Sequence, residues 1–192
     1  DSPLADVDRD DPAWFFFTSG TTGRPKASVL THGQLAFVIN NHLCDLVPAI
    51  TPNDASLVVA PLSHGAGMHQ LLMVARGAPT ILAGSTRFDP AEIWELVEKW
   101  RVTNIFTVPT ILKMLVEAPQ VHERDHSSLR YVVYAGAPMY RTDQIRALET
   151  LGPILVQYFG LGEVTGAITY LPPADHDAGD TARVGTCGFA RT

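Results

Sequence analysis

Cysteine is nearly absent from the sequence, which has only Cys44 and Cys187 among 192 residues. The two lie far apart and fit neither the paired spacing of a zinc site nor the regular set of a disulfide framework. We therefore expect both to be free, buried thiols. A small secreted domain held together by disulfides is excluded on the same ground.

Long apolar runs are lacking as well. No segment approaches the roughly 20 apolar residues that a membrane-spanning helix needs. The acidic start, DSPLADVDRDDP, is unlike the basic and then apolar start of a secretory signal. The chain is nevertheless 46% hydrophobic, which is enough to build the core of one domain. We expect a globular, cytoplasmic protein without a membrane span.

Clustered positive charge is the third absence. The chain has 14 Lys and Arg against 20 Asp and Glu, which gives a net charge of −6, and the basic residues are scattered. Binding to nucleic acid needs Lys and Arg gathered on one surface to neutralise phosphates. The composition therefore argues against a nucleic-acid partner.

Short apolar runs recur along the chain at strand length. They are almost continuous in apolar residues, which is typical of parallel strands that are buried on both faces. The expected strands are 14–17, 56–60, 80–83, 104–108, 130–134 and 153–158.

Helix signals fall between these runs. Thr31 begins a capping box with Gln34, Asp89 precedes a proline at a first helical position, and a third helix is expected from Thr142 to a closing Gly152. Strands that alternate with helices predict an α/β fold with a mostly parallel sheet and right-handed crossovers.

A run of hydroxyl residues and glycines, TSGTTGRPK, follows the first expected strand at residues 18–26. Open parallel sheets bind ligands beyond the carboxyl ends of their strands. Glycines let backbone N–H groups approach an anion, hydroxyls add donors, and Lys26 adds a positive charge. The run is not a Walker loop, because Pro25 and Ala27 flank the lysine where that motif has Gly and Ser or Thr. A phosphate cradle fits these features better than a plain surface loop.

The run closely resembles the phosphate-binding signature of the adenylate-forming enzymes, a superfamily of acyl-CoA synthetases, luciferases and adenylation domains of nonribosomal peptide synthetases. Further stretches resemble later motifs of that family, in the same order. They are APLSHGAGMH (60–69), YAGAP (134–138), QYFGLGE (157–163) and RVGTCG (183–188). The resemblance implies that residues 1–192 are the nucleotide-binding part of an acyl-CoA synthetase-like fold. The family's N-terminal lobe and its mobile C-terminal domain, which carries the catalytic lysine, would lie outside this segment.

The resemblance also implies a role for each motif. The phosphates of ATP would be held by Thr18, Ser19, Gly20, Thr21, Thr22, Gly23 and Lys26. The adenine pocket would be formed by Gly136, Ala137, Pro138, Tyr158, Phe159 and Gly160. His64 would lie beside the acid substrate and Glu163 would bind Mg2+, so that Lys26, Glu163 and His64 would serve catalysis.

The reaction implied is the ATP-dependent conversion of a carboxylic acid to an acyl-adenylate, followed in the full-length enzyme by transfer to coenzyme A. We expect the segment alone to be inactive. Relatives that activate amino acids usually place an aspartate near PLSHGAG, which has none, and residues 65–78 are apolar and small. A fatty acid or another apolar acid is therefore the expected substrate.

Two positions depart from the family pattern. Gly162 stands where a threonine is usual, and the sequence leaves open whether Thr165 or a backbone group replaces the missing hydroxyl. Phe159 stands where a tyrosine is usual. The alternative is therefore a non-catalytic nucleotide-binding or scaffold module. The sequence leaves the oligomeric state open.

Several other residues receive ordinary structural interpretations. HERDH at 122–126 matches the zinc motif HExxH only formally, because no helix of sufficient length surrounds it, and we expect an exposed loop there. His32 and His69 are expected to be structural, and Trp94 and Trp100 to pack in the core. Residues 171–180 are expected to form a mobile surface loop.

Overall fold

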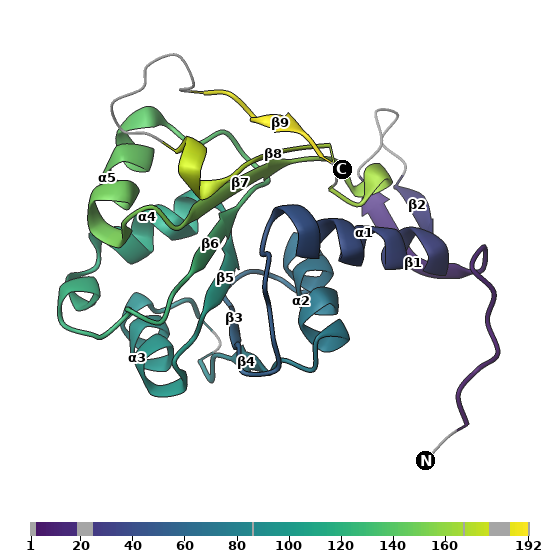
Figure 1. The fold of residues 1–192 in the computed structure, drawn as a ribbon, viewed down its shortest axis with the longest axis horizontal. Coiled ribbons are helices and arrows are strands. Elements are labelled where there is room, and N and C mark those ends of the chain that lie inside the picture. The colour runs from purple at the N-terminus through teal and green to yellow at the C-terminus, as the bar shows by residue number, and fades with distance from the viewer. Residues whose placement is uncertain (1–2, 19–24, 86, 167, 177–184, 192) are drawn as a thin grey trace.

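The computed structural model describes residues 3–18, 25–85, 87–166, 168–176 and 185–191. A seven-stranded sheet runs through the molecule in the order β4-β3-β5-β6-β7-β8-β9 (Figure 1). The strands from β4 to β7 are mutually parallel, and β8 and β9 are antiparallel at one edge. The strands are β3 (Ser56–Val58), β4 (Thr80–Leu82), β5 (Asn104–Thr107), β6 (Tyr131–Tyr134), β7 (Leu155–Phe159), β8 (Thr169–Leu171) and β9 (Phe189–Ala190).

Helices cover both faces of this sheet. One face carries α3 (Pro90–Trp100), α4 (Pro109–Glu117) and α5 (Arg141–Leu151), and the other carries α1 (His32–Asp45) and α2 (Gly65–Ala75) (Figure 1). Short 3-10 helices follow α4, β7 and β8: η1 (Pro119–His122), η2 (Gly162–Val164) and η3 (Pro173–Asp175). The α/β fold with a mostly parallel sheet is therefore confirmed.

Successive residues of the strands enter two different cores. On β6, Val132 and Tyr134 pack with α3, α4 and α5, whereas Val133 and the following Ala135 pack with α2. Because both faces are buried, the strand sequence has no polar alternation. This explains why continuous apolar runs predicted the central strands β5, β6 and β7. The edge strand β4 was also predicted from an apolar run, although Leu82 is 61% exposed.

The predicted helix starts are also present. Thr31 caps α1 in a capping box: the Gln34 N–H donates to its hydroxyl at 3.3 Å, and its own N–H donates to the Gln34 side chain at 2.8 Å. At α3, the Asp89 carboxylate accepts the N–H of Ala91 at 2.9 Å. Each cap satisfies backbone donors that the first helical turn leaves free.

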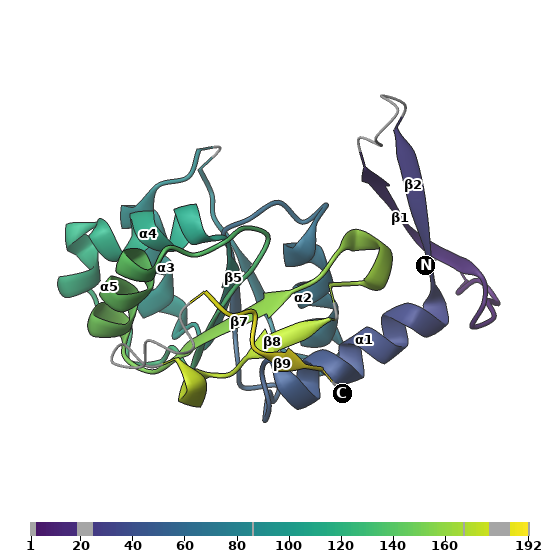
Figure 2. The same ribbon diagram turned by 90° about the horizontal axis from the view of Figure 1, so that it is seen from above.

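The first predicted strand does not belong to the large sheet. β1 (Pro12–Thr18) pairs with β2 (Lys26–Thr31) as a separate antiparallel hairpin, with Phe15 opposite Val29. Figure 2 shows this hairpin standing away from the body of the protein at the start of α1. The prediction that residues 14–17 form a parallel strand of the main sheet is therefore wrong, because an apolar run fixes a strand but not its partner.

Several side chains are more exposed than the sequence predicts. Cys44 and Cys187 are free thiols as expected, but both are exposed. Trp94 is buried and donates its indole N–H to the Leu115 carbonyl at 3.0 Å, whereas Trp100 is 52% exposed. The expectation of buried thiols, and of a packed Trp100 at the last position of α3, is wrong.

The predicted loop at 171–180 is partly ordered structure. Leu171 ends β8, η3 follows, and His176 is buried against Tyr134 with its Nε2 at 3.0 Å from the tyrosine hydroxyl. Residues 177–180 lie outside the described residues. The prediction of a surface loop is therefore wrong for residues 171–176.

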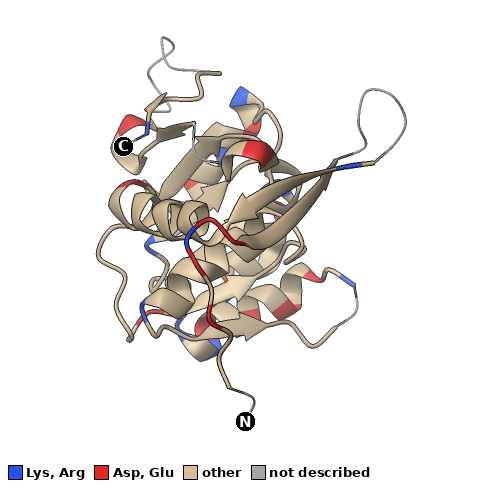
Figure 3. Cartoon of the chain, turned by 90° about the vertical axis from the view of Figure 1, so that its right-hand side faces the viewer, with Lys and Arg blue, Asp and Glu red and all other residues tan. Residues whose placement is uncertain are grey.

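Among the other histidines, His69 is completely buried, as expected of a structural residue. His32 is exposed at the first position of α1, so its structural role stays a prediction. η1 ends at His122, which is exposed as expected. Within the described ranges, no three His, Cys, Asp or Glu side chains gather as metal ligands. None of the described helices is long and apolar enough to cross a membrane. Figure 3 shows Lys and Arg dispersed over several elements of the face turned to the viewer.

Candidate functional site

Three of the sequence motifs meet around one apolar pocket of about 350 Å³. His64 comes from the segment before α2, Gly136 from the loop after β6, and Tyr158 and Gly160 from the end of β7. The carboxyl ends of β5, β6 and β7 form one side of the pocket, which is where open parallel sheets bind ligands. The first strand reaches this pocket from a separate hairpin, through Phe16.

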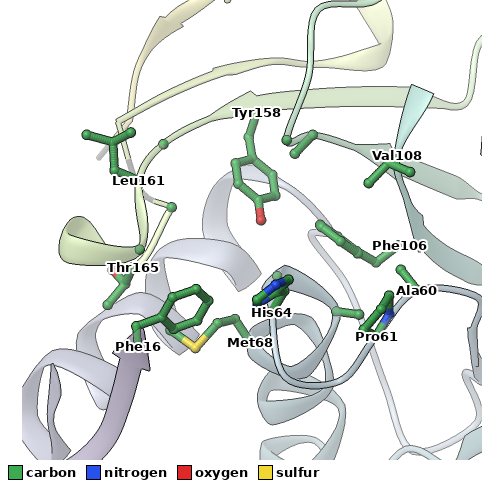
Figure 4. Close-up of a pocket in the computed structure, with 17 residues that line it drawn as sticks. Phe16, Ala60, Pro61, His64, Met68, Phe106, Val108, Tyr158, Leu161 and Thr165 are labelled. Atoms are coloured by element: carbon green, nitrogen blue, oxygen red, sulfur yellow. The ribbon is translucent and has the colours of Figure 1, made fainter. Parts of the chain in front are cut away.

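Aromatic rings dominate the walls of this pocket (Figure 4). The ring of Phe16, from β1, lies 5.6 Å from that of His64, and the ring of Phe106, from β5, lies 5.9 Å from that of Tyr158. Met68 completes the wall from α2. Aromatic faces and a thioether favour a flat or chain-like apolar group.

The glycines of PLSHGAG allow α2 to approach the sheet and the hairpin. A Cβ atom added at Gly65 would lie 2.7 Å from the Phe106 ring, and one added at Gly67 would lie 2.0 Å from the Leu62 carbonyl oxygen. His64 itself is exposed at the N-cap of α2, where its Nδ1 lies 2.9 Å from the Ser63 carbonyl oxygen. The small residues therefore bring an exposed imidazole to the rim of the pocket.

A tight turn follows β7 and closes another side of the pocket. The Gly166 N–H donates to the Leu161 carbonyl at 2.9 Å, and Thr165 adopts a left-handed conformation with φ 56°. A Cβ atom on Gly160 would lie 2.2 Å from the carbonyl carbon of Gly166. The turn therefore depends on the absence of a side chain at Gly160.

We expect Gly160→Ala to lower the free energy of unfolding by about 2–3 kcal/mol, because a backbone atom, unlike a flexible side chain, cannot yield to the new methyl group. Urea denaturation measures the loss. Gly84→Ala is the matched control, because its Cβ would lie 3.5 Å from the Glu92 carboxylate, an ordinary contact, and should change stability by less than about 1 kcal/mol. Equal midpoints for the two variants would contradict the close approach of Gly160 to Gly166.

Gly162, where the family usually has threonine, packs directly on the hairpin. Its added Cβ would lie 2.6 Å from Cδ1 of Phe16. A threonine would therefore need Phe16 to move out of the pocket wall. Thr165, the possible replacement, lines the pocket, and its hydroxyl donates to the carbonyl of Val164 at 2.6 Å.

The candidate magnesium ligand, Glu163, lies on η2 and lines a second, more polar cleft of about 450 Å³. This cleft is also lined by Arg9, Thr31 and Gln34, and Thr165 contributes to both cavities. Glu163 is exposed, and the described residues offer its carboxylate no ion-pair partner. One free carboxylate fits Mg2+, which usually keeps several waters and binds one or two carboxylates together with substrate phosphates.

The hairpin brings the two ends of the phosphate motif together. Thr18 and Lys26 are paired residues of β1 and β2, and Lys26 is exposed. Its ammonium forms no ion pair within the described part of the chain. The remaining candidates, Ser19, Gly20, Thr21, Thr22 and Gly23, lie outside the described residues.

Some candidate adenine residues lie at the rim of the apolar pocket, and others lie in its interior. Gly136, Ala137 and Pro138 are exposed after β6, with Gly136 at φ 85° on the pocket wall. Phe159 is 45% exposed, whereas its neighbour Tyr158 is 8% exposed and belongs to the pocket. Neighbouring residues of a strand face opposite sides, so Phe159 cannot share the pocket interior with Tyr158.

Sequence reasoning missed the residues that form the floor and back wall, namely Phe16, Met68, Phe106 and Val108. Phe106 and Val108 lie in a run predicted only as a strand. Phe106 and Val108 are two residues apart at the carboxyl end of a parallel strand, so they lie on one face of it. That spacing would have predicted that both line the pocket.

Comparison with known proteins agrees with this geometry. The family model described as "AMP-binding enzyme" matches residues 1–192. A medium/long-chain-fatty-acid–CoA ligase of Mycobacterium tuberculosis is 35% identical over 97% of this chain and 32% of its own length. A feruloyl-CoA synthase of Amycolatopsis is 34% identical over 90% of the chain and 34% of its own length.

Solved structures share the fold at lower sequence identity. A fatty acyl CoA synthetase of Mycobacterium tuberculosis superposes with a TM-score of 0.84 at 26% identity and covers 100% of this chain and 36% of its own. The o-succinylbenzoate CoA synthetase of Bacillus subtilis in complex with AMP gives 0.81 at 27% identity, with 96% and 36% covered. The chain spans about a third of the length of these relatives. It belongs to the family of AMP-binding enzymes.

Proposed function

We propose that the full-length protein is an AMP-forming acid–thiol ligase, and that residues 1–192 are its nucleotide-binding part. The observation that carries this proposal is the convergence of three motifs on one apolar pocket at the carboxyl ends of parallel strands. Relatives support it, because they include CoA ligases named for fatty acids, 4-coumarate and indoleacetate, and a feruloyl-CoA synthase. Each of these acids combines a carboxylate with an apolar body.

The chemistry explains why such a site needs both polar and apolar parts. A carboxylate resists nucleophiles because its oxide is a poor leaving group. In the proposed reaction, a carboxylate oxygen attacks the α-phosphorus of ATP, the bond to the bridging oxygen breaks, and pyrophosphate leaves with the electron pair. The thiolate of coenzyme A then attacks the acyl carbon, and AMP leaves. Positioning and charge neutralisation supply most of the catalysis in such transfers.

The proposed role of each residue follows from its position in the site. The β- and γ-phosphates would be bound by Thr18, by residues 19–23 and by the exposed Lys26. Glu163 would hold Mg2+, which neutralises phosphate charge when bound. Gly136, Ala137, Pro138, Phe159 and Gly160 would form the adenine edge. His64, at the rim of the apolar pocket, would meet the carboxylate end of a fatty or aryl acid whose body fills the pocket.

The test is acid-dependent exchange of labelled pyrophosphate into ATP by the full-length protein, over a panel of apolar acids. We expect exchange with at least one acid, and no exchange without acid. ATP binding without exchange for any acid would favour the non-catalytic alternative. Thioester formation by residues 1–192 alone should be absent, because the chain covers only about a third of its relatives' length.

A further inference from the structure

The hydroxyl of Tyr158 is a polar group on the wall of an otherwise apolar pocket. The side chain is 8% exposed and lies on the pocket wall. Figure 4 shows its hydroxyl directed into the cavity. No hydrogen bond joins this hydroxyl to any residue within the described part of the chain.

Tyr134, the other buried tyrosine of the sheet, has a hydroxyl with several partners, unlike Tyr158. The Tyr134 hydroxyl lies 3.0 Å from the Gln144 amide nitrogen, 3.1 Å from the Gln157 side-chain oxygen and 3.0 Å from Nε2 of His176. Buried hydroxyls are nearly always hydrogen-bonded, because leaving one unpaired costs its full desolvation energy. Tyr158 therefore keeps a hydrogen-bonding capacity that the protein itself does not use.

Glycines hold the hydroxyl open toward the cavity. A Cβ atom on Gly65 would lie 3.0 Å from the hydroxyl oxygen, and one on Gly166 would lie 3.4 Å from it. The ring is fixed on its other sides by Phe106 and by the edge of His42, whose ring centre lies 5.9 Å away. A side chain at either glycine would fill the space from which a ligand could reach the oxygen.

The pocket lining favours an uncharged partner for this hydroxyl. Burial raises the pKa of Tyr158 well above its ordinary value, so the phenol keeps its proton and can donate it in a hydrogen bond. The pocket lining includes no Lys, Arg, Asp or Glu among its described residues, and His64 is its only imidazole. Arg191 lies outside this lining and pairs with Asp45 at 3.5 Å, although its charge acts on Tyr158. A charged tail would lie against an apolar lining that offers it no ion-pair partner among the described residues, which is costly.

The volume and walls of the pocket limit the class of ligand further. Its volume of about 350 Å³ is near the lower end of the range of roughly 300–1,000 Å³ for ligand pockets. Rings of Phe16, His64, Phe106 and Tyr158 surround it, and aromatic rings pack well in such walls. A compact aryl group fits these walls better than a long hydrocarbon chain.

We propose that Tyr158 is a specificity-determining residue, whose hydroxyl hydrogen-bonds an uncharged oxygen substituent on the body of an aryl acid. The substrate class is then oxygen-substituted aryl acids, those carrying a hydroxyl, methoxy or oxo group. This inference rests on the proposed ligase function, because it assigns the pocket to the acid. His64 lies at the rim, so the acid's carboxylate faces outward and its substituent meets Tyr158.

Tyr158→Phe tests the proposal because it removes the hydroxyl and keeps the ring. The assay is pyrophosphate exchange by the full-length protein with two acids that differ only in a hydroxyl, 3-(4-hydroxyphenyl)propanoic and 3-phenylpropanoic acid. We expect the wild type to favour the hydroxylated acid in kcat/KM by about tenfold or more. Tyr158→Phe should abolish that preference by lowering kcat/KM for the hydroxylated acid alone.

The control is Tyr140→Phe, because Tyr140 is 76% exposed at the N-cap of α5 and should leave the preference unchanged. An equal preference in wild type and Tyr158→Phe, or none in the wild type, would overturn the proposal while leaving the ligase function intact. Calorimetric titration with the same two acids separates the two hypotheses. Discrimination in binding that is lost in Tyr158→Phe supports the tyrosine's role even if exchange fails with every acid.

Discussion

Acidification from pH 7 to pH 4 should lower the free energy of unfolding by about 6 kcal/mol through two buried histidines alone. Burial lowers the pKa of His69 from 6.5 to about 4. Burial, with the nearby charge of Arg191, lowers the pKa of His42 from 6.5 to about 3. Each native imidazole therefore stays neutral at a pH where the unfolded chain already carries the proton.

The sign follows from proton linkage. Between pH 6.5 and the lowered native pKa, the unfolded state binds more protons than the native state, so stability falls as the pH falls. The stabilisation is complete above pH 6.5. Each histidine contributes a loss of about 3 kcal/mol by pH 4, which is a large part of the roughly 5–15 kcal/mol that stabilises most domains.

The surroundings of both rings explain why protonation is unfavourable. His69 lies between α2 and β5, where its Nε2–H donates to the Asn104 side chain at 2.8 Å. His42 donates its Nδ1–H to the Val38 carbonyl at 2.8 Å near the end of α1. The remaining nitrogen of each ring is buried and has no partner among the described residues. A second proton would therefore be buried without an acceptor.

Urea unfolding of wild type and His69→Gln at pH 7, 6, 5 and 4 measures the effect. Glutamine cannot take up the proton, and its amide can still donate to Asn104. The variant's unfolding energy should therefore fall less steeply, by up to about 1.4 kcal/mol per pH unit. His32→Gln, at an exposed position on α1, should follow the wild type. If His69→Gln kept the full wild-type pH dependence, the neutral buried imidazole would be refuted.

The sequence predicted the central sheet well because its strands are buried on both faces. Such strands leave an apolar run with no competing signal, and the caps at Thr31 and Asp89 marked two helices between them. Two other helices carried no such mark. α2 begins after His64 and α4 after Val108, and neither residue makes a side-chain capping bond. α2 is also buried over most of its length, so it lacks the polar stripe that reveals a helical period.

Partners of strands were harder to predict than the strands themselves. The aromatic run of β1 is typical of a core strand, yet β1 pairs with β2. The sequence of β2, KASVLT, shows little alternation of polar and apolar residues, and this strand was not predicted. Phe15 and Phe17 are consequently 53% and 67% exposed. Pairing in a hairpin is decided by the turn between the strands and by tertiary packing, which a single apolar run does not encode.

Motif resemblance named residues that line the pocket but not how they share it. It assigned His64 to the acid substrate and Gly136 and Gly160 to adenine, and all three line the same pocket. It could not foresee that Tyr158 enters the pocket while Phe159 is exposed, because that depends on the facing of β7. Nor could it explain Gly162, whose missing side chain leaves room for Phe16. Both features come from packing between elements that are distant in the sequence.

Replacing Lys26 with Ala, or Glu163 with Gln, should lower acid-dependent pyrophosphate exchange by about 10²–10³-fold in the full-length protein. Both side chains are exposed, and the described residues give neither an ion-pair partner. Charge that is unpaired in the free protein is available to the phosphates and to Mg2+ when ATP binds. Removing it takes away stabilisation of the developing pyrophosphate charge.

Because Lys26 and Glu163 are exposed, their substitution should change the free energy of unfolding by less than about 0.5 kcal/mol, as is usual for surface residues. Urea midpoints should therefore match the wild type, so that lost exchange reports lost function. Glu149→Gln on α5 and Lys99→Ala on α3 are the matched controls, since both residues are exposed and line neither cavity, and both variants should keep full exchange. Wild-type exchange in Lys26→Ala and Glu163→Gln would show that other groups neutralise the phosphates. A loss confined to Glu163→Gln and relieved by raised Mg2+ would identify that carboxylate as the metal ligand and leave Lys26 without a catalytic role.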